Sequence, residues 1–443
     1  MTRTIRVVAL ALVIGLSASC EGGRASRPHS LVLITLDTTR ADRLPAYGFE
    51  SISTPALDRL AQEGVVFDYA MTVAPLTLTA HTSLFTGLYP PHHAVRDNAD
   101  APLDPSHQTL ATILQTAGFT TGAFVGATVL GHDRGLAPGF DVYDDGAAPD
   151  GGRPARRRPG NQVVDHALAW LDTVSSVPFF LWVHLYDAHA PQAPPDRYRR
   201  EDGDAYLAGI AFEDEQVGRV LGALEQRHLL ETTAVVVAGD HGESLGEHGE
   251  AEHGIFVYDN VLHVPLIVRA PGVRPGRATG LVSLVDVLPT VRDLFGLPAN
   301  SVDGESLLPS LERGRDPQRV GVYAESMYAK RFGWSPLRAV IEGRFEYIDA
   351  PRPELYDLDS DPFESHDLSS QSSAVTAAMR RELDILGGEN KPGPEAPTTA
   401  EIRDRLKTLG YTSGTALASM GGPARDPKDY IETYNASRPR GLR

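Results

Sequence analysis

Two apolar segments that each run into residues able to bind a cation constrain the fold of this chain most strongly. Residues 31–36 read Leu-Val-Leu-Ile-Thr-Leu and lead to Asp37, and residues 233–239 read Thr-Ala-Val-Val-Val-Ala-Gly and lead to Asp240 and His241. Apolar runs of this length are typical of strands buried on both faces of a parallel sheet. Ligands of such sheets lie at the carboxyl ends of the strands, so these polar side chains are expected to converge. Two carboxylates and an imidazole predict a divalent-metal site.

Helical and strand-like patterns alternate along the first two thirds of the chain. Further strands are expected at 65–67, 119–127, 178–187 and 263–269, and helices at 54–64, 107–117, 161–175 and 204–229. In the first of these helices Thr54 is the expected cap and Pro55 the first residue. The alternation predicts an α/β fold with a mainly parallel central sheet sandwiched by helices, and we assign this domain to residues 30–309.

The pattern changes after Pro309. Residues 320–325, 338–341 and 345–348 alternate between apolar and polar residues like antiparallel strands. They predict a smaller C-terminal α+β subdomain at about 310–375. The remaining tail, 376–443, is expected to be partly helical, with helices near 373–386 and 400–409, and otherwise loosely ordered.

The N-terminus is typical of an export signal. Two arginines precede an apolar run at 7–16 that is too short to span a bilayer, so residues 1–19 are interpreted as a signal peptide. Cys20, the only cysteine, follows small residues as in bacterial lipoprotein signals. Lipidation there would anchor the protein to a membrane surface through a tether at 20–29. The expected location is the periplasm or the cell envelope.

The overall charge limits the partners. A formal net charge of −17 excludes nucleic acid as an expected partner. An anionic ester substrate must instead be attracted locally, by a metal ion and by helix N-termini. A single cysteine also means that the fold cannot depend on an internal disulfide. Nothing in the pattern reveals the oligomeric state.

The segment around Thr77 supplies a hydroxyl group. Pro75 keeps the chain extended, residues 79–85 form about two helical turns, and Gly87 followed by Pro90 ends them. Thr77 is therefore expected beside a helix N-terminus, where free N–H groups and the helix dipole favour an anion. A phosphate-like or sulfate-like group could meet the Thr77 hydroxyl there. The alternative is a threonine that only caps the helix or forms a turn.

Five separated motifs resemble the sulfatase family of the alkaline-phosphatase-like superfamily, and they occur in that family's order. The motifs are LFTGLYP (84–90), AGDHG (238–242), VSLVDVLPT (282–290), DGESLLP (303–309) and ELYDLDSDPFE (354–364). The resemblance implies a metal-dependent ester hydrolase with Thr77 at the position of the family's nucleophile. It also implies one or two divalent ions, such as Ca²⁺, Mg²⁺, Mn²⁺ or Zn²⁺.

The resemblance assigns Asp37, Asp240 and His241 as metal ligands, together with Thr77 itself. Thr38 stands where relatives often carry a second ligating acid or amide. A hydroxyl is a weaker ligand than either, so the predicted site carries less negative charge than the family's usual one.

Several histidines acquire roles from the same resemblance. His189 is expected to contact the anionic group of the substrate, and His253 to bind the substrate or protonate the leaving group. His81 replaces an arginine common in sulfatases and is expected to steady Thr77 or to accept its proton. Asp187, His189 and His253 could also form a second metal site.

The nucleophile segment departs from the sulfatase pattern Cys-x-Pro-Ser-Arg, because it reads Thr-Leu-Thr-Ala-His at 77–81. Threonine cannot become the formylglycine that expels sulfate by elimination. Water must therefore release a covalent threonine adduct by attack on the central atom, a route suited to phosphorus. The prediction is a sulfate or phosphate/phosphonate ester hydrolase with a slight preference for phosphorus, as in Thr-dependent phosphodiesterases and phosphonate hydrolases of the superfamily. The alternatives are a phospho-group transferase and an inactive sulfatase-like binding protein.

Overall fold

The computed structural model describes residues 27–146, 157–174, 176–388 and 425–437. The predicted signal peptide at 1–19, the lipidation site Cys20 and the predicted helix at 400–409 lie outside these residues. Within the part of the chain that is described, no helix combines the length and the apolar character needed to cross a membrane.

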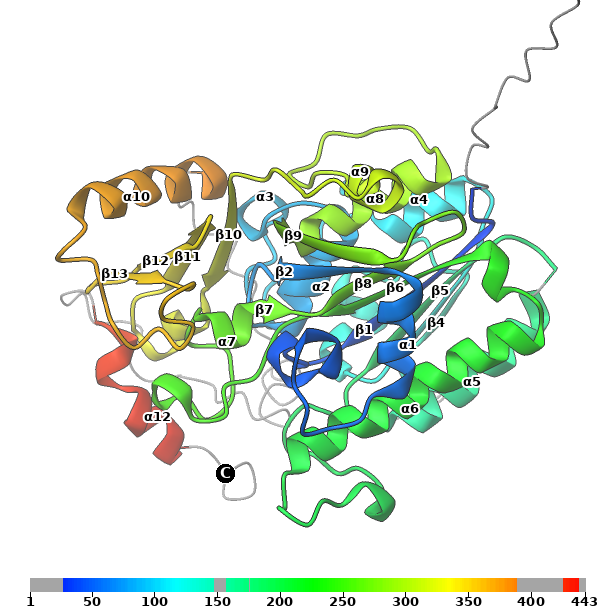
Figure 1. Ribbon diagram of the computed structural model, residues 1–443, viewed down its shortest axis with the longest axis horizontal. Coiled ribbons are helices and arrows are strands. Elements are labelled where there is room, and N and C mark those ends of the chain that lie inside the picture. Colours follow the sequence, from blue (N-terminus) through cyan, green and yellow to red (C-terminus); the bar gives the residue numbers. More distant parts are fainter. Residues whose placement is uncertain (1–26, 147–156, 175, 389–424, 438–443) are drawn as a thin grey trace, which may run out of the picture.

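A nine-stranded sheet forms the centre of the molecule (Figure 1). Its order is β4-β3-β5-β1-β6-β8-β2-β7, with β9 paired to β2. The strands are β1 (Ser30–Leu36), β2 (Val65–Met71), β3 (Thr120–Val125), β4 (Val142–Asp144), β5 (Phe179–Leu185), β6 (Thr233–Gly239), β7 (His263–Val264), β8 (Leu266–Arg269) and β9 (Gly276–Ser283). Strands β4, β3, β5, β1 and β6 are parallel, which confirms a mainly parallel sheet.

The remaining strands of the sheet pair in both parallel and antiparallel directions. Strand β8 is antiparallel to both β6 and β2, so β2 runs in the same direction as β6. The carboxyl ends of β1, β2, β5 and β6 therefore lie at one edge of the sheet. The predicted strand at 263–269 is divided into β7 and β8 at Pro265, because proline has no N–H to donate to a ladder.

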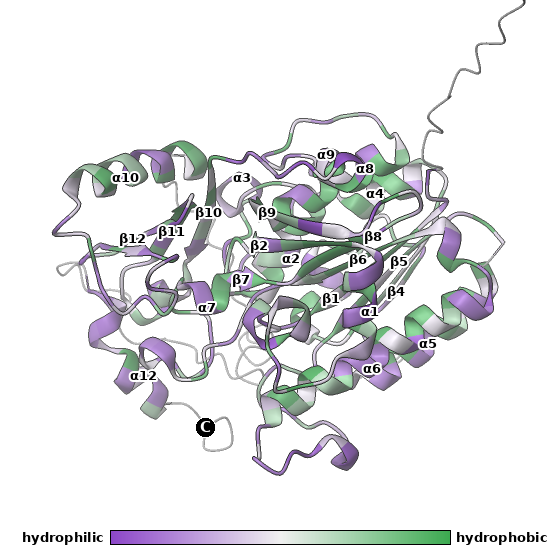
Figure 2. Cartoon of the chain, viewed as in Figure 1, coloured by the Kyte–Doolittle hydropathy of each residue, from purple (hydrophilic) through white to green (hydrophobic). Residues whose placement is uncertain are grey.

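Helices cover both faces of the central sheet. One face carries α1 (Pro55–Glu63), α5 (Gly160–Val174) and α6 (Ala205–Gln226), and the other carries α2 (Thr77–Thr86), α4 (Leu110–Thr116) and α8 (Val287–Phe295). The alternation of side chains along β1 explains this arrangement, because Leu31 and Leu33 belong to one core and Val32 and Ile34 to the other. In Figure 2 the central strands are mainly hydrophobic, whereas α5 and α6 also carry hydrophilic residues.

The start of α1 differs in one detail from the prediction. Thr54 occupies the cap position, but its hydroxyl donates to the Asp58 carboxylate instead of accepting from the helix. The free N–H groups of Ala56 and Leu57 donate to Asp214 of α6. A carboxylate from a neighbouring helix therefore replaces the local cap, and this ties α1 to α6.

A second, four-stranded antiparallel sheet lies beside the first (Figure 1). It contains β10 (Gly321–Ser326), β11 (Leu337–Glu342), β12 (Phe345–Asp349) and β13 (Glu354–Asp357), and α10 (Ser373–Gly387) packs on it. The short helices are α3 (Pro90–His93), α7 (Asp259–Leu262), α9 (Leu308–Arg313) and α12 (Ile431–Ser437). The antiparallel strands lie within the segment expected to contain them, and the domain boundaries drawn there stay a prediction.

Candidate metal and nucleophile site

Helix α2 places Thr77 at the sheet edge where the polar strand ends lie. Leu76 is extended, with φ −146° and ψ 122°, and Thr77 is the first helical residue. The helix therefore begins two residues earlier than predicted, and it ends at Gly87, whose φ of 69° is left-handed. The Leu78 N–H in the first turn donates to Asn98 Oδ1 over 2.9 Å. Thr77 lies where free helix N–H groups favour an anion.

Four of the predicted residues, Thr77 among them, converge at this edge of the sheet. Thr77 Oγ1 lies 3.4 Å from Asp37 Oδ2 and 3.2 Å from His241 Nε2. His241 Nε2 is also 3.6 Å from Asp240 Oδ2. All four side chains are buried. The structure thus brings Asp37, Thr77, Asp240 and His241 together, although more than two hundred residues separate Asp37 from Asp240 and His241 in the chain.

The polar atoms at this point are mainly acceptors. His241 Nδ1 donates to the Gly242 carbonyl over 2.9 Å, so the lone pair of His241 Nε2 faces the other side chains. Asp37 Oδ1 and Asp240 Oδ2 are buried and accept no hydrogen bond. Buried carboxylate oxygens without donors are costly unless a cation lies between them. Asp37, Asp240 and His241 also form one of two described groups whose ligand atoms are close enough to hold a metal ion. These residues fit a divalent cation.

Burial shifts the pKa values of all three candidate ligands in the direction that favours their neutral forms. It raises the pKa of Asp37 to about 7, and it raises the pKa of Asp240 well above its usual value, with a further contribution from the charge of Asp37. Burial and the nearby His253 lower the pKa of His241 well below its usual value. A cation would reverse the shifts of both carboxylates by favouring their charged forms.

Thr38 lies in the turn that follows Asp37. Its φ of 55° is unusual for a β-branched residue, and hydrogen bonds hold it there: its N–H donates to Asp240 Oδ1, and its carbonyl accepts from the Tyr206 hydroxyl over 2.7 Å. The Thr38 hydroxyl is buried and has no hydrogen-bond partner. Thr38 is thus joined to the site through Asp240.

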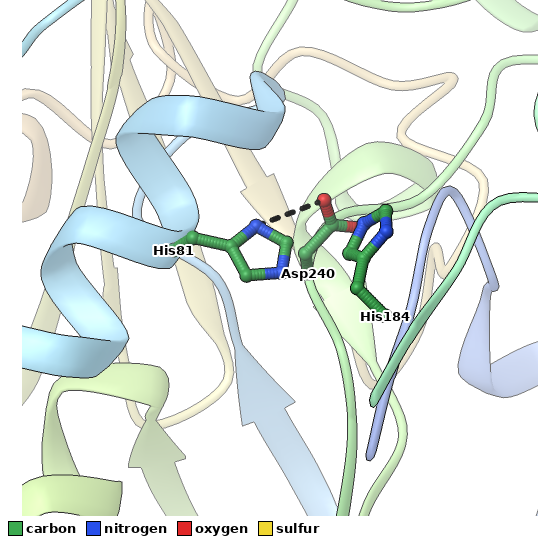
Figure 3. Close-up of side chains that lie close together, drawn as sticks. All are labelled: His81, His184 and Asp240. Atoms are coloured by element: carbon green, nitrogen blue, oxygen red, sulfur yellow. Dashed lines mark ion pairs between the residues drawn. The ribbon is translucent and has the colours of Figure 1, made fainter. Parts of the chain in front are cut away.

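The second described group with ligand-like spacing contains His81, His184 and Asp240 (Figure 3). His81 Nδ1 lies 3.5 Å from Asp240 Oδ2. Spacing alone therefore does not distinguish the two groups. The hydrogen bonds of His81 distinguish the two groups.

Both ring nitrogens of His81 are already engaged. Trp182 Nε1 donates to Thr35 Oγ1, so the Thr35 hydroxyl donates in turn to His81 Nε2 over 3.0 Å. His81 Nδ1 donates to the Thr77 backbone carbonyl over 2.7 Å. Burial, together with His184, lowers the pKa of His81 well below its usual value, so the ring is neutral. Neither nitrogen retains a lone pair for a metal ion, and His81 contacts the Thr77 backbone rather than its hydroxyl.

His184 is a site residue that the sequence interpretation missed. Its Nε2 donates to Asp37 Oδ2 over 3.2 Å, and burial lowers its pKa to about 3. The available signal was an ionisable side chain near the carboxyl end of the otherwise apolar strand β5. The contact with Asp37 depends on the pairing of β1 with β5, which the local sequence does not specify.

His189 and His253 lie on one side of His241. The ring centroids of His253 and His241 are 4.5 Å apart, and those of His189 and His253 are 4.9 Å apart. His253 Nδ1 lies 2.9 Å from a carboxylate oxygen of Glu243, a second residue that the sequence interpretation missed. The two histidines expected to contact the substrate therefore adjoin the candidate metal ligands.

The structure does not bring together the three residues that could form a second metal site. The Asp187 carboxylate accepts from the Gly160 N–H over 2.9 Å and from Arg157 over 3.3 Å. Neither described group with ligand spacing contains Asp187, His189 or His253. Asp187 is engaged by the start of α5 and by an arginine, which leaves His189 and His253 without its carboxylate.

These features define a class of protein. Buried carboxylates and a histidine at the strand ends of an α/β sheet, with a hydroxyl at a helix N-terminus, are the parts of a metal-dependent ester hydrolase. The chain belongs to the sulfatase family, within the alkaline-phosphatase-like superfamily. The model of that family, described as Sulfatase, matches residues 29–297. A second model, described as N-sulphoglucosamine sulphohydrolase, C-terminal, matches residues 246–387.

Individual relatives agree with this assignment. A choline-sulfatase of Rhizobium meliloti is 27% identical over 429 residues, covering 77% of this chain and 82% of that protein. A Delta 4,5-hexuronate-2-O-sulfatase of Bacteroides thetaiotaomicron is 25% identical, covering 90% of this chain and 97% of that protein. The crystal structure of the phosphonate monoester hydrolase of Agrobacterium radiobacter shares the fold, with a TM-score of 0.69 at 24% identity. The match covers 81% of this chain and 95% of that chain. This chain is a sulfatase-like ester hydrolase.

Proposed function

We propose that this protein hydrolyses sulfate, phosphate or phosphonate esters with Thr77 as the nucleophile and with phosphorus esters preferred. The observation that carries the proposal is the position of Thr77 Oγ1, 3.4 Å from Asp37 and 3.2 Å from His241 at the N-terminus of α2. A hydroxyl that is buried among unpaired acceptors and helix N–H groups is suited to meet an anionic ester.

A divalent cation held by Asp37, Asp240 and His241, with Thr38 as a weaker ligand, would stabilise ionised Thr77 and the charge that develops on the ester. Thr77 Oγ then attacks the central atom, the bond from that atom to the leaving oxygen breaks, and a covalent adduct forms. Water attacks the same atom to release it and to regenerate the hydroxyl. His81 acts as a positioning residue, because it donates to the Thr77 carbonyl and thereby fixes the first turn of α2.

Other side chains are proposed to bind the substrate. His189 contacts the anionic oxygens, and His253, hydrogen-bonded to Glu243, protonates the leaving oxygen. Asn98 is a further donor, because its Nδ2 is buried without a hydrogen-bond partner while its Oδ1 binds the Leu78 N–H. An anionic oxygen beside Thr77 would satisfy that unpaired N–H.

The nucleophile supports the preference for phosphorus. A threonine adduct has no second hydroxyl through which sulfate could be expelled by elimination, whereas attack by water on phosphorus needs none. Sulfate esters are the second candidate, favoured by the family and by its relatives named sulfatases. Transfer of the phospho group to an acceptor other than water would use the same residues.

The test is a set of assays on purified protein with an aryl sulfate, a phosphate monoester, a phosphate diester and a phosphonate monoester. Each is measured after metal removal and after addition of Mn²⁺, Zn²⁺, Mg²⁺ or Ca²⁺. We expect metal-dependent turnover that is fastest on a phosphorus ester. Turnover of the aryl sulfate alone would contradict the preference for phosphorus. Absence of turnover on all four esters, together with absence of bound metal, would indicate a binding protein on a hydrolase scaffold.

We also propose that the protein is exported and held at a membrane surface by a lipid on Cys20. The support is the sequence, in which a basic start, a short apolar run and small residues precede the single cysteine. A substrate outside the cytoplasm follows from this location.

A further inference from the structure

A cavity whose lining shares no residue with the candidate metal site lies between the loops that follow β6 and the segment that follows β13. Its volume is about 300 Å³. It is lined by Arg40, Asp42, Tyr69, Glu247, His248, Asp259, Asn260, His263, Leu358, Pro362, Phe363 and Glu364. None of these residues has a role in the proposed reaction, so the cavity needs an explanation of its own.

The lining carries more negative than positive charge. It includes four carboxylates and one guanidinium, that of Arg40. Arg40 is already used, because it binds Asp42 through two hydrogen bonds and Glu247 through a third at 2.8 Å. The carboxylates of Asp259 and Glu364 therefore have no strong cation among the lining residues to balance them. Their nearest bases are His263, 3.7 Å from Asp259, and His248, 4.0 Å from Glu364.

Glu364 is the unusual member of this lining. Its side chain is 3% exposed, Oε2 accepts from the Asp259 N–H over 2.9 Å, and Oε1 has no hydrogen-bond donor. Directly against it lies Glu346 of β12, which is fully buried and has no donor to either oxygen. Burial raises the pKa of both side chains well above the usual value, and the charge of Glu364 raises that of Glu346 further. Without a cation, the two carboxyl groups must share a proton.

The groups packed around this pair do not neutralise it. Glu354 of β13 and Asp259 of α7 add negative charge. Lys428 forms an ion pair with Glu354 over 3.1 Å. Tyr258 also donates to Glu354. His248 is stacked on Tyr258 and is the nearest base to Glu364.

Aromatic faces complete the cavity. Tyr69 is 44% exposed and stacks on His263, with ring centroids 5.8 Å apart and planes at 13°. Phe363 is 78% exposed beside Glu364. Exposed aromatic rings next to carboxylates are favourable surroundings for an organic cation. A bare metal ion fits less well, because among the described residues no three ligands here are close enough to hold one, and the volume exceeds that of a single ion.

We propose that this cavity binds a small organic ammonium ion whose N–H groups donate to Glu364 and whose carbon atoms lie against Tyr69 and Phe363. A cation beside Glu364 favours the ionised forms of Glu364 and Glu346, so the proton that they share passes to the solvent. Binding is therefore tighter at higher pH, and each bound cation releases up to one proton. The site is separate from the ester-hydrolysing centre, and its occupancy does not depend on the proposed reaction.

Calorimetric titration of the whole protein with ethanolammonium chloride tests this proposal. The titration is run in two non-amine buffers of different ionisation enthalpy, with sodium chloride at equal ionic strength as the salt control. We expect saturable binding of one ion per chain, accompanied by proton release, which sodium chloride does not reproduce. The absence of saturable binding, or an equal response to sodium chloride, would overturn the proposal.

Two variants and a matched control locate the site. Glu364→Gln removes the charge that the cation meets and should raise the Kd at least tenfold. Glu346→Lys places an ammonium within the protein, so it should abolish ethanolammonium binding and raise the Tm. Glu312→Gln makes the same charge change on exposed α9 and should leave the Kd unaltered. An unchanged Kd in Glu364→Gln and in Glu346→Lys would contradict the assignment.

Discussion

Thr77 is the residue on which the proposed chemistry depends. Thr77→Ala should lower kcat by about 10⁴-fold or more, because loss of a nucleophile removes the covalent route. The metal content of the variant should stay close to that of the wild type, since Asp37, Asp240 and His241 remain. Steady-state kinetics and elemental analysis check both parts.

The control for that variant is Thr82→Ala. Thr82 is buried in the same helix, and its hydroxyl donates within the helix to the Leu78 carbonyl. Its loss should change stability slightly and leave kcat within about twofold. Equal losses of kcat in the two variants would show that α2 packing, and not the Thr77 hydroxyl, is responsible.

The protonation of Asp37 links metal binding to pH. In the metal-free protein the pKa of Asp37 is about 7, above the 3.8 of an unburied aspartate. Between these two pH values, the Asp37 carboxyl is therefore protonated in the folded state and ionised in the unfolded state. In the metal-free protein, the contribution of Asp37 to stability should therefore fall as the pH rises from about 4 to 7. A cation favours the ionised carboxylate and opposes this loss.

The measurement is the Tm with chelator and with added metal at pH 5 and pH 8. We expect the increase in Tm caused by the metal to be larger at pH 8. A larger increase at pH 5 would contradict the assignment of Asp37 as a ligand.

At the scale of secondary-structure elements, α6 supports two loops of the site through Glu213. Glu213 Oε1 accepts from the backbone N–H groups of Asp187 and Ala188, at 2.8 and 2.9 Å, and Oε2 accepts from the Thr39 hydroxyl. Helix α6 thereby holds the turn after β1 and the loop that leads to His189.

Glu213→Leu should destabilise the protein by about 3 kcal/mol or more, because three buried donors lose their acceptor at roughly 1–3 kcal/mol each. Glu213→Gln keeps an oxygen acceptor and should retain most of the stability and activity. Chemical denaturation and kcat/KM check the pair. Similar behaviour of both variants would show that the contacts of Glu213 are not what holds the loops.

Elements whose sequence signals are local could be predicted, and elements that depend on distant parts of the chain could not. Apolar runs and breaker residues predicted β1, β5, β6, α1 and α6, and the strand-end rule placed Asp37, Asp240 and His241 together. The short strand β4 and the division of β7 from β8 depend on pairing partners distant in the chain. Long-range pairing also explains why His184, Asn98 and Glu243 were missed, since each acts through a residue on another segment.

The second metal site stays a prediction, and motif spacing alone does not show which partner its carboxylate takes. Asp187 and His189 are two residues apart, yet the carboxylate of Asp187 is engaged by Gly160 and Arg157. Arg157 lies in a polar segment rich in glycine, proline and arginine, which carries no local signal for this contact. Which partner a carboxylate takes depends on the packing of α5, and no local pattern specifies that.

At the scale of the whole molecule, the two sheets and the sulfatase family assignment account for most of the chain. The proposed location of the enzyme depends on the N-terminal segment. Cys20→Ala should move the protein from the membrane fraction to the soluble fraction of the cell envelope, because it removes the residue proposed to carry the lipid. Fractionation and immunoblotting check this. An unchanged membrane fraction would contradict the lipid anchor.

The most direct test of the central claim is the anomalous scattering of crystals of the protein grown with Mn²⁺ or Zn²⁺. The account predicts a peak bounded by Asp37, Asp240 and His241 and within bonding distance of Thr77 Oγ1. A peak on His81 and His184, or no peak while the protein is active, would contradict it.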